Sequence, residues 1–319
     1  MLPGHAGFAG WREKVQRRAL APAEAYRMAV AADRLRDRQV EVGYRLYWMS
    51  EVVLGSVEIH AQPSGYAVIG RHGSCDVVLE DEQVVSLRHV LVRAASLHDG
   101  FPIISVLDLQ TTMGFELSDG SRQQSVAATG PIVFRVGTHS VVGLPSSGRF
   151  PDELPVPFVE RGDKAPQRPR PVRLVTPQED VAPLSRITVL PASVDFSQRR
   201  STPFGVAAAP TGEGYEVMLE SGGQRAGVRL SKADLEHGVL LGRADKCVDE
   251  GMRAILGTTI SRVHVLLIRE NGACHLYDVA SLVGTYAAGQ RVRYLPLADS
   301  GSAVQLAMRG GVTLRWRAI

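Results

Sequence analysis

A three-part motif occurs twice in this 319-residue chain, and the duplication limits the possible folds more than any other feature. The first copy contains Gly70-Arg71, Ser86-Leu87-Arg88-His89 and the loop Asp108 to Gly114. The second copy contains Gly242-Arg243, Ser261-Arg262-Val263-His264 and the loop Asp278 to Thr285. Matched residues lie 172 positions apart in the first part, 175 in the second and 170 in the third. Such a near-constant offset predicts one domain duplicated with small loop insertions and deletions.

The repeat extends beyond the motif. Tyr44 precedes Gly70 by 26 residues and Tyr215 precedes Gly242 by 27, so the duplication covers whole domains. A chain of this length exceeds what one core usually fills, and two domains of roughly 110 residues are the natural division. We expect a helical arm at 1–39, a first domain at 40–146, a Pro-rich linker at 147–212 and a second domain at 213–319.

Apolar residues in both domains follow the period of a β-strand. Val42, Tyr44, Leu46 and Trp48 alternate with polar or small residues, and similar short runs follow between turn residues. Strands are predicted at 52–59, 66–69, 77–79, 89–93, 103–109, 132–136 and 140–144, and again at 215–219, 228–230, 239–241, 263–268, 275–279, 304–308 and 312–316. Short strands without helical patterns between them favour antiparallel sandwiches. The fold class is therefore mainly β, with two antiparallel β-sandwiches and a short helical arm.

The arm and the linker are less regular. Pro22 suits the first position of a helix predicted over Pro22–Arg38, and a shorter basic helix is expected at Trp11–Leu20. Prolines and charges accumulate between the domains, which is typical of an extended linker. Its apolar stretches Val172–Val175 and Ile187–Leu190 are candidates for docking onto a domain, the alternative being a loosely tethered spacer.

Composition and charge bear on which kinds of partner and which cellular location to expect. The net charge of +3 gives no argument for nucleic acid or membrane as a partner. No apolar run approaches the ~20 residues of a membrane span, and Met1–Gly10 lacks the order of a signal peptide. Only four of the 36 cationic residues are Lys, a bias typical of high-GC bacterial genomes. We therefore expect a cytoplasmic bacterial protein.

The repeated residues suit a phosphate ligand. A phosphate on a Thr side chain carries nearly two negative charges and strong acceptor oxygens. A guanidinium grips two such oxygens, and a nearby hydroxyl adds another donor. Gly-Arg at the end of a strand supplies the first group, and the Ser before the next strand supplies the second. Both copies therefore carry a candidate anion site in their loops.

These motifs resemble the forkhead-associated (FHA) domain, with its Gly-Arg, Ser-Arg-x-His and Asn-Gly elements. The resemblance covers about residues 42–146 and 214–319 and implies two-sheet sandwiches that bind phosphothreonine peptides through loops at one end. It implies phosphopeptide contacts by Arg243, Ser261 and Arg262 in the second copy and by Arg71 and Ser86 in the first. The matched loop-bracing residues are His89, His264, Gly114 and Gly284.

Both copies depart from the family pattern. Leu87 stands where the family has Arg, although Arg88 is adjacent. Met113 and Val283 occupy the Asn position, and losing the family's bond to the peptide backbone costs on the order of 1 kcal/mol. The first copy has Phe115 where the second keeps Thr285, and the second replaces a short strand with a longer loop at 245–259. The second copy has the fuller phosphate set.

Catalysis and metal binding are not expected. Cys75 and Cys247 both follow their motif glycine by five residues, so they are interpreted as equivalent packing positions, and no CxxC or other metal spacing occurs. Asp108 and Asp278 are expected to fix turns. No catalytic residues, cofactor or metal ligands are predicted, and the chain is expected not to be an enzyme.

The resemblance implies a non-enzymatic adaptor that recognises a phosphothreonine-containing protein, such as a substrate of a bacterial Ser/Thr kinase. The alternative is a phospho-independent scaffold, in which degenerate sandwiches serve as a subunit of a larger assembly. Thr176, beside Pro177 in the linker, is a candidate internal ligand once phosphorylated, against the simpler interpretation of a solvated spacer.

Overall fold

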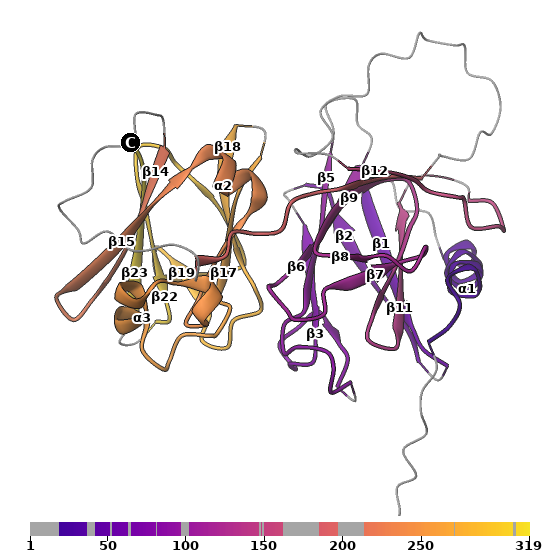
Figure 1. Cartoon of the computed structure of the whole chain (residues 1–319), viewed down its shortest axis with the longest axis horizontal. Helices are drawn as coiled ribbons and strands as arrows, with labels where there is room; N and C mark the ends of the chain where they lie inside the picture. The colour runs from indigo at the N-terminus through magenta and orange to yellow at the C-terminus, as the bar shows by residue number, and fades with distance from the viewer. Residues whose placement is uncertain are drawn as a thin grey trace, which may run out of the picture.

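The computed structural model describes residues 19–36, 42–51, 53–62, 65–80, 82–96, 102–146, 148, 150–161, 185–196, 214–270, 272–308 and 311–319. They form two β-sandwiches that lie side by side, with one helix on the outer side of the first (Figure 1). The prediction of a mainly β fold is confirmed. The candidate helix at Trp11–Leu20, the apolar stretch Val172–Val175 and Thr176 lie outside or almost outside these residues.

The first sandwich has two facing sheets. One has the strand order β2-β1-β11-β10-β7-β8 and the other β12-β13-β9-β6-β5-β3-β4. The strands are β1 (Gly43–Met49), β2 (Leu54–His60), β3 (Tyr66–Gly70), β4 (Val77–Val78), β5 (Val90–Ser96), β6 (Pro102–Asp108), β7 (Phe115–Leu117), β8 (Arg122–Gln123), β9 (Ser125–Thr129), β10 (Ile132–Val136), β11 (His139–Pro145), β12 (Phe158–Arg161) and β13 (Arg186–Val189).

The second sandwich repeats this order. Its sheets run β15-β14-β23-β22-β19-β20 and β16-β17-β18-β21. Its elements are β14 (Gly214–Ser221), β15 (Gln224–Ser231), α2 (Lys232–His237), β16 (Val239–Leu241), the 3-10 turn η2 (Asp245–Cys247), α3 (Glu250–Leu256), β17 (Val265–Glu270), β18 (Ala273–Asp278), β19 (Thr285–Ala287), β20 (Gln290–Val292), β21 (Tyr294–Leu297), β22 (Ser302–Leu306) and β23 (Val312–Ala318). The region expected as a loop at 245–259 contains η2 and α3, and the short α2 was not predicted.

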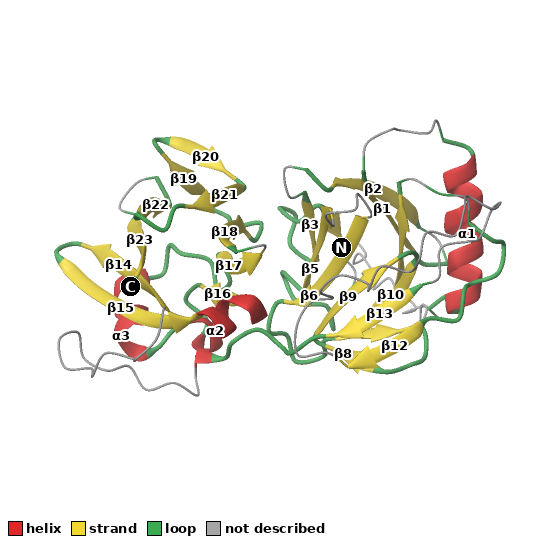
Figure 2. Ribbon diagram, turned by 90° about the horizontal axis from the view of Figure 1, so that it is seen from above, coloured by secondary structure: helices red, strands yellow, loops and turns green. Residues whose placement is uncertain are grey.

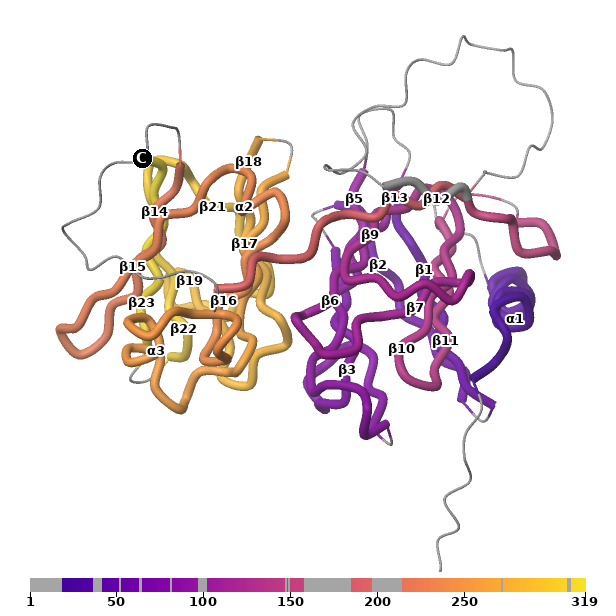
Figure 3. The backbone as a smooth tube through the Cα atoms, viewed as in Figure 1, coloured from indigo at the N-terminus to yellow at the C-terminus, as the bar shows by residue number. Residues whose placement is uncertain are grey.

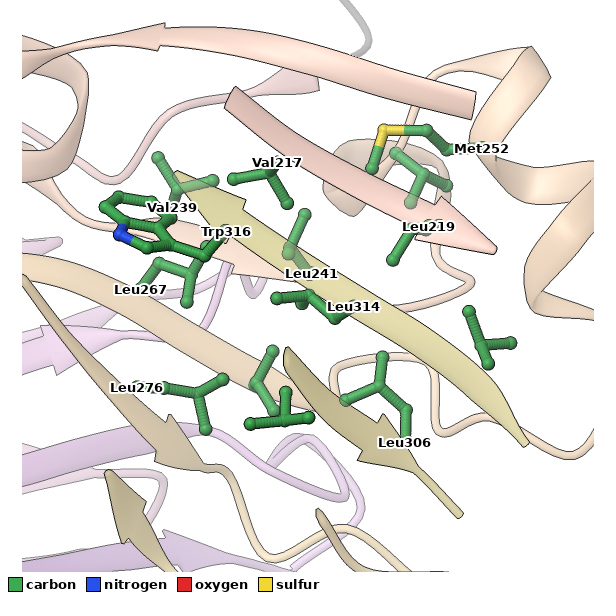
Figure 4. Packing of buried hydrophobic residues seen from close by; sticks show 14 of the residues in the cluster. Val217, Leu219, Val239, Leu241, Met252, Leu267, Leu276, Leu306, Leu314 and Trp316 are labelled. Atoms are coloured by element: carbon green, nitrogen blue, oxygen red, sulfur yellow. The ribbon is translucent and has the colours of Figure 1, made fainter. Parts of the chain in front are cut away.

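Strand alternation produces the core of each sandwich. In the second, Val217 and Leu219 of β14 point inward beside Leu314 and Trp316 of β23 (Figure 4). These side chains are 0–1% exposed. The ring of Trp316 stacks on Tyr215, with centroids 4.6 Å apart. The period-2 pattern seen in the sequence is therefore the inward face of these strands.

The helix α1 (Pro22–Arg34) covers the outer face of the first sandwich, on the side away from the second (Figure 2). It begins at Pro22 and ends four residues before the predicted Arg38. Tyr26 and Val30 are buried against Tyr47 and Met49, whose side chains leave β1 on the face opposite to the core. The helix thus shields an apolar sheet face from water.

Part of the segment expected as a linker is built into the first sandwich. Strand β13 pairs antiparallel with β9, and β12 pairs parallel with β13. Ile187 and Thr188 are 1% and 3% exposed, because Ile187 packs into the core of the sandwich. Of the two proposed docking stretches, Ile187–Leu190 therefore docks. The chain then crosses to the second sandwich (Figure 3), where Val194 forms a parallel bridge with Val239.

A shared hydrophobic cluster joins the sandwiches. It contains five buried residues from each, and every member matches one on the other side at the motif offsets: Val68 with Leu240, Cys75 with Cys247, Leu91 with Leu266, Leu107 with Tyr277, and Leu109 with Val279. An interface that presents the same patch from both partners is isologous, as in two-fold dimers. The chain thus contains an internal pseudo-dimer.

Polar contacts reinforce this interface. Arg93 pairs with Glu270 and lies 5.7 Å from the centroid of the Tyr277 ring. Arg293 pairs with Asp76 at 2.8 Å and lies 4.8 Å from the Tyr66 ring centroid. The Tyr66 hydroxyl donates to the carbonyl of Asp278 or Arg293, at 2.6 and 2.8 Å. These contacts fix how the two sandwiches are oriented.

Candidate functional site

The Gly-Arg and Ser segments of each copy are brought together by backbone pairing. In the second sandwich, the Arg243 amide donates to the Ser261 carbonyl at 3.1 Å, and the Ala244 amide donates to the Arg262 carbonyl at 2.9 Å. Gly242 is required here because a Cβ would lie 2.3 Å from the Arg262 carbonyl oxygen. In the first sandwich, Arg71 donates to the Ser86 carbonyl in the same way, at 3.0 Å.

A buried histidine joins this pair of segments to the third loop. Nδ1 of His264 accepts from the Ser261 amide at 3.4 Å, and its Nε2 lies 3.3 Å from the Gly284 carbonyl. In the first sandwich the same contacts of His89, with Ser86 and Gly114, are 3.0 and 2.7 Å long. Burial lowers the pKa of His264 to about 4, so the ring is neutral at pH 7 and accepts at Nδ1 while donating at Nε2.

The third loop of the second copy is closed by Asp278. Its carboxylate accepts from the Ser281 amide at 2.7 Å, the Ser281 hydroxyl at 2.6 Å and the Thr285 hydroxyl at 2.7 Å. Gly284 has φ +81°, a backbone conformation that side chains other than Gly rarely adopt, and its amide donates to the Ser281 hydroxyl. The loop is thus held in one shape from inside.

The matching loop of the first copy has fewer such bonds. Among the described residues, Asp108 accepts only from the amide and hydroxyl of Thr111, at 2.8 and 2.5 Å, because Phe115 replaces the second hydroxyl donor. Burial raises the pKa of the Asp108 carboxyl. Both aspartates end a strand, and their carboxylates bond to the turn that follows, as the sequence predicted.

The motif arginines are anchored and still exposed. Nε of Arg243 donates to the Ile260 carbonyl at 2.9 Å, and Nε of Arg71 donates to the Val85 carbonyl at 3.1 Å. Within the described parts of the chain, the terminal guanidinium nitrogens of Arg243 make no hydrogen bond, and the side chain faces solvent. Four N–H donors on each arginine are therefore free to meet an anion.

The serine positions differ between the copies. Ser261 is 9% exposed, and its hydroxyl oxygen accepts from the Leu282 amide at 3.2 Å, which leaves its proton for a ligand. Ser86 is half-buried. Arg262 beside Ser261 is exposed, whereas the matching Leu87 presents an apolar side chain that is 42% exposed. The second sandwich brings Arg243, Ser261 and Arg262 to one edge, and the first brings only Arg71 and Ser86.

Arg88 does not substitute for the missing arginine of the first copy. It is 8% exposed and points into the interface, where its Nε donates to the Ala280 carbonyl of the second sandwich at 2.8 Å. The position that Arg262 fills in the second copy is therefore filled in the first copy by Leu87, with no arginine beside it that faces solvent. Nothing in the motif itself signals this direction of Arg88.

Sequence reasoning missed a second pair of arginines. Strand pairing matches Arg122 with Arg291, since Gln123 faces Phe115 in the first copy and Val292 faces Thr285 in the second. Arg291 donates from Nη2 to the Ser281 carbonyl at 3.3 Å, and Arg122 contacts the sulfur of Met113. Extending the comparison of the copies past Gly284 would have revealed this pair. Arg291 adds a positive charge to the loop end of the second sandwich.

The two residues at the Asn position have different surroundings. Met113 is 42% exposed, whereas Val283 packs against the core of the second sandwich. Leu282, at 67%, is the more exposed residue of that loop. The rim of the second site is thus apolar where the family pattern has an amide.

No group of three or more His, Cys, Asp or Glu side chains suited to a metal ion occurs among the described residues. The three cysteines are free and buried, and burial raises the pKa of Cys75 and Cys274 to about 11 and that of Cys247 to about 12. Their thiols therefore stay protonated at neutral pH. Across the same described part of the chain, helices are too short or too polar to span a membrane.

Comparison with known proteins identifies one domain. Residues 239–306 match the family model described as FHA domain, so this part of the chain is an FHA domain. The match covers Arg243, Ser261, Arg262, His264 and Gly284. Comparison with curated proteins gives no match.

Several solved structures resemble parts of the chain. FHA-1 of Mycobacterium tuberculosis Rv1747 is 23% identical, with 33% of this chain and 97% of that one covered and a TM-score of 0.27. M. tuberculosis EmbR in complex with a low-affinity phosphopeptide is 21% identical, with 39% and 30% covered and a TM-score of 0.26. The yeast Dun1 FHA domain, bound to a doubly phosphorylated peptide, is 17% identical, with 46% and 94% covered and a TM-score of 0.29.

Proposed function

We propose that the chain is a non-enzymatic adaptor that recognises phosphothreonine segments of a partner protein through the loop end of its second sandwich. The partner is a substrate of a bacterial Ser/Thr kinase, and the encounter takes place in the cytoplasm. The observation that carries the proposal is the edge at which the exposed Arg243 and Arg262 flank the Ser261 hydroxyl, within a matched FHA domain. These groups offer the guanidinium and hydroxyl donors that a dianionic phosphate needs.

Pre-organisation supports this assignment. Arg243 is held by its Nε, Ser261 by the Leu282 amide and the third loop by Asp278, so that a ligand need not order them. A site that is already ordered loses less entropy on binding. We assign the first sandwich to the same FHA-like class, because its strand order and its buried histidine match those of the second.

The alternative of a phospho-independent scaffold applies best to the first sandwich. There Leu87 occupies the position of the second arginine and Arg88 is engaged in the interface. We therefore assign Arg71 and Ser86 a minor part in phosphate binding. For the whole chain, a phospho-independent scaffold is the alternative function.

The test is a titration of the full chain with a library of phosphothreonine peptides and their unphosphorylated counterparts, followed by fluorescence anisotropy. If the chain recognises phosphothreonine, only the phosphorylated peptides should bind saturably. Inorganic phosphate at high concentration should compete with them. Equal affinity for both forms, or binding to neither, would favour the scaffold.

A further inference from the structure

The loop that completes the second site is held from the first sandwich. The carbonyl oxygen of Ala280 accepts three hydrogen bonds from it: from Arg88 Nε at 2.8 Å, from Arg88 Nη2 at 2.5 Å and from the Ser74 hydroxyl at 2.7 Å. The two guanidinium donors form a fork on one acceptor. All three donors belong to the first sandwich.

Ala280 also needs to be held. Its φ of +50° is in the left-handed region, which an alanine adopts only when its surroundings impose it. Two residues further on, the Leu282 amide donates to the hydroxyl of Ser261, and Gly284 meets His264. The position of Ala280 is thus transmitted over four residues to the serine and histidine of the candidate site.

The matching residue of the first copy also makes contacts outside its own sandwich. Gln110 corresponds to Ala280 and has a φ of +58°. Its Nε2 donates to the Val194 carbonyl at 2.6 Å, and its Oε1 accepts from the thiol of Cys247 at 3.7 Å. Each third loop therefore contains, two residues after its aspartate, a left-handed residue that is held by groups outside its own sandwich.

We propose that Arg88 is a positioning residue for phosphopeptide binding by the second sandwich, an inference that rests on the proposed function. It touches no phosphate itself. Its fork on Ala280 fixes the loop whose Leu282 amide orients the Ser261 hydroxyl, so that the first sandwich serves as the support of the second site. The unit that binds the phosphopeptide is consequently the pair of sandwiches, because Arg88 of the first holds the loop Asp278 to Thr285 of the second.

Four substitutions distinguish this role from general stabilisation of the interface. Arg88→Gln removes the fork and leaves a neutral side chain, whereas Arg88→Lys keeps the charge and one donor. The matched control is Arg293→Gln, which removes another contact between the sandwiches, the pair with Asp76, and touches neither Ala280 nor Leu282. Ser74→Ala removes the third donor from an exposed side chain and carries little risk to folding.

The experiment uses the full chain and two readouts. Affinity for a phosphothreonine peptide chosen from the library is measured by calorimetry, and amide hydrogen exchange is followed over 278–285 without ligand. We expect Arg88→Gln to weaken binding at least fivefold and to raise exchange at Leu282 and Gly284. Arg88→Lys should recover part of both, Ser74→Ala should lose about twofold, and Arg293→Gln should match the wild type.

Each outcome decides a separate point. Wild-type affinity and exchange in Arg88→Gln would overturn the positioning role, as would equal losses in Arg88→Gln and Arg293→Gln. Faster exchange at 278–285 in Arg88→Gln, in a chain that binds no phosphopeptide, would leave the support of the loop standing and remove the proposed function instead. An unchanged thermal midpoint in each variant shows that folding is not the cause.

Discussion

The two sandwiches share one strand order but differ on the sheet face that lies away from the core. In the first, Tyr47, Met49 and their neighbours on β10 and β11 are apolar and covered by α1. In the second, the positions that match Tyr47 and Met49 carry Met218 and Glu220, and Glu220 pairs with Arg315 of β23. A shared fold therefore constrains the inward residues of both copies, whereas the outward residues follow whatever covers that face.

The same contrast holds at the loop ends. Both copies keep the histidine brace and the aspartate turn, which are internal supports. They differ in the groups that face outward, since the second has Arg262 where the first has Leu87. The internal supports are therefore the same in both sandwiches, whereas the exposed groups beside them differ.

The largest expected effect comes from exchanging residues between the outward sheet faces of the two sandwiches. Met49 is 0% exposed beneath α1, so Met49→Glu buries a carboxylate without a partner and should lower the free energy of unfolding by about 3 kcal/mol or more. The matching exchange, Glu220→Met, lies on the uncovered face and should leave the unfolding midpoint close to that of the wild type. Chemical denaturation measures both. Equal losses would mean that α1 does not shield the first face.

A smaller effect separates the two candidate sites. Arg243→Ala should weaken binding of a phosphothreonine peptide by about 2 kcal/mol, because a charge-assisted contact is lost. Arg71→Ala should weaken it much less, since Leu87 and the engaged Arg88 leave that site incomplete. Calorimetry on the full chain compares the two. If Arg71→Ala were the more damaging substitution, the assignment of the working site would be reversed.

The smallest effect concerns the histidine brace. The pKa of His264 is about 4 in the folded chain, below its ordinary value near 6.5, so the unfolded chain binds the proton more readily between these values. The contribution of neutral His264 is therefore full above pH 6.5 and is lost as the pH falls toward 4. Thermal unfolding should show a loss of about 1 kcal/mol between about pH 7.5 and about pH 6. In His264→Gln that part of the pH dependence should disappear, and an unchanged slope would contradict the assignment.

Much of the fold could be predicted from the sequence because alternation and the repeat both report on the core. Strands β10 and β16 were predicted with their observed bounds, and most others within a few residues. The strands β7, β8, β19 and β20 were missed, since two or three residues show no period. The longer β9 and β21 were missed as well. Strand β13 was hidden in a Pro-rich segment, and its pairing with β9 depends on a tertiary contact.

The sequence indicated which residues form the candidate site but not the interface that holds its third loop. Motif spacing found Arg243, Ser261 and His264, whose partners lie within the same domain. The interface required information from both domains, although one signal was present. Ile103 to Leu109 is almost continuously apolar, a pattern typical of a strand buried on both faces, and Leu107 and Leu109 indeed face the second sandwich.

The internal pseudo-dimer has a consequence for how its two halves can change. In a dimer of identical chains, a substitution at a two-fold interface appears twice, so an arginine on one side is always matched by an arginine on the other. Here Arg88 faces the second sandwich while its counterpart Val263 packs into the same cluster from the other side. Joining both halves in one chain allows a donor on one side and an apolar residue on the other. The covalent connection thus permits a division of labour that symmetry would forbid.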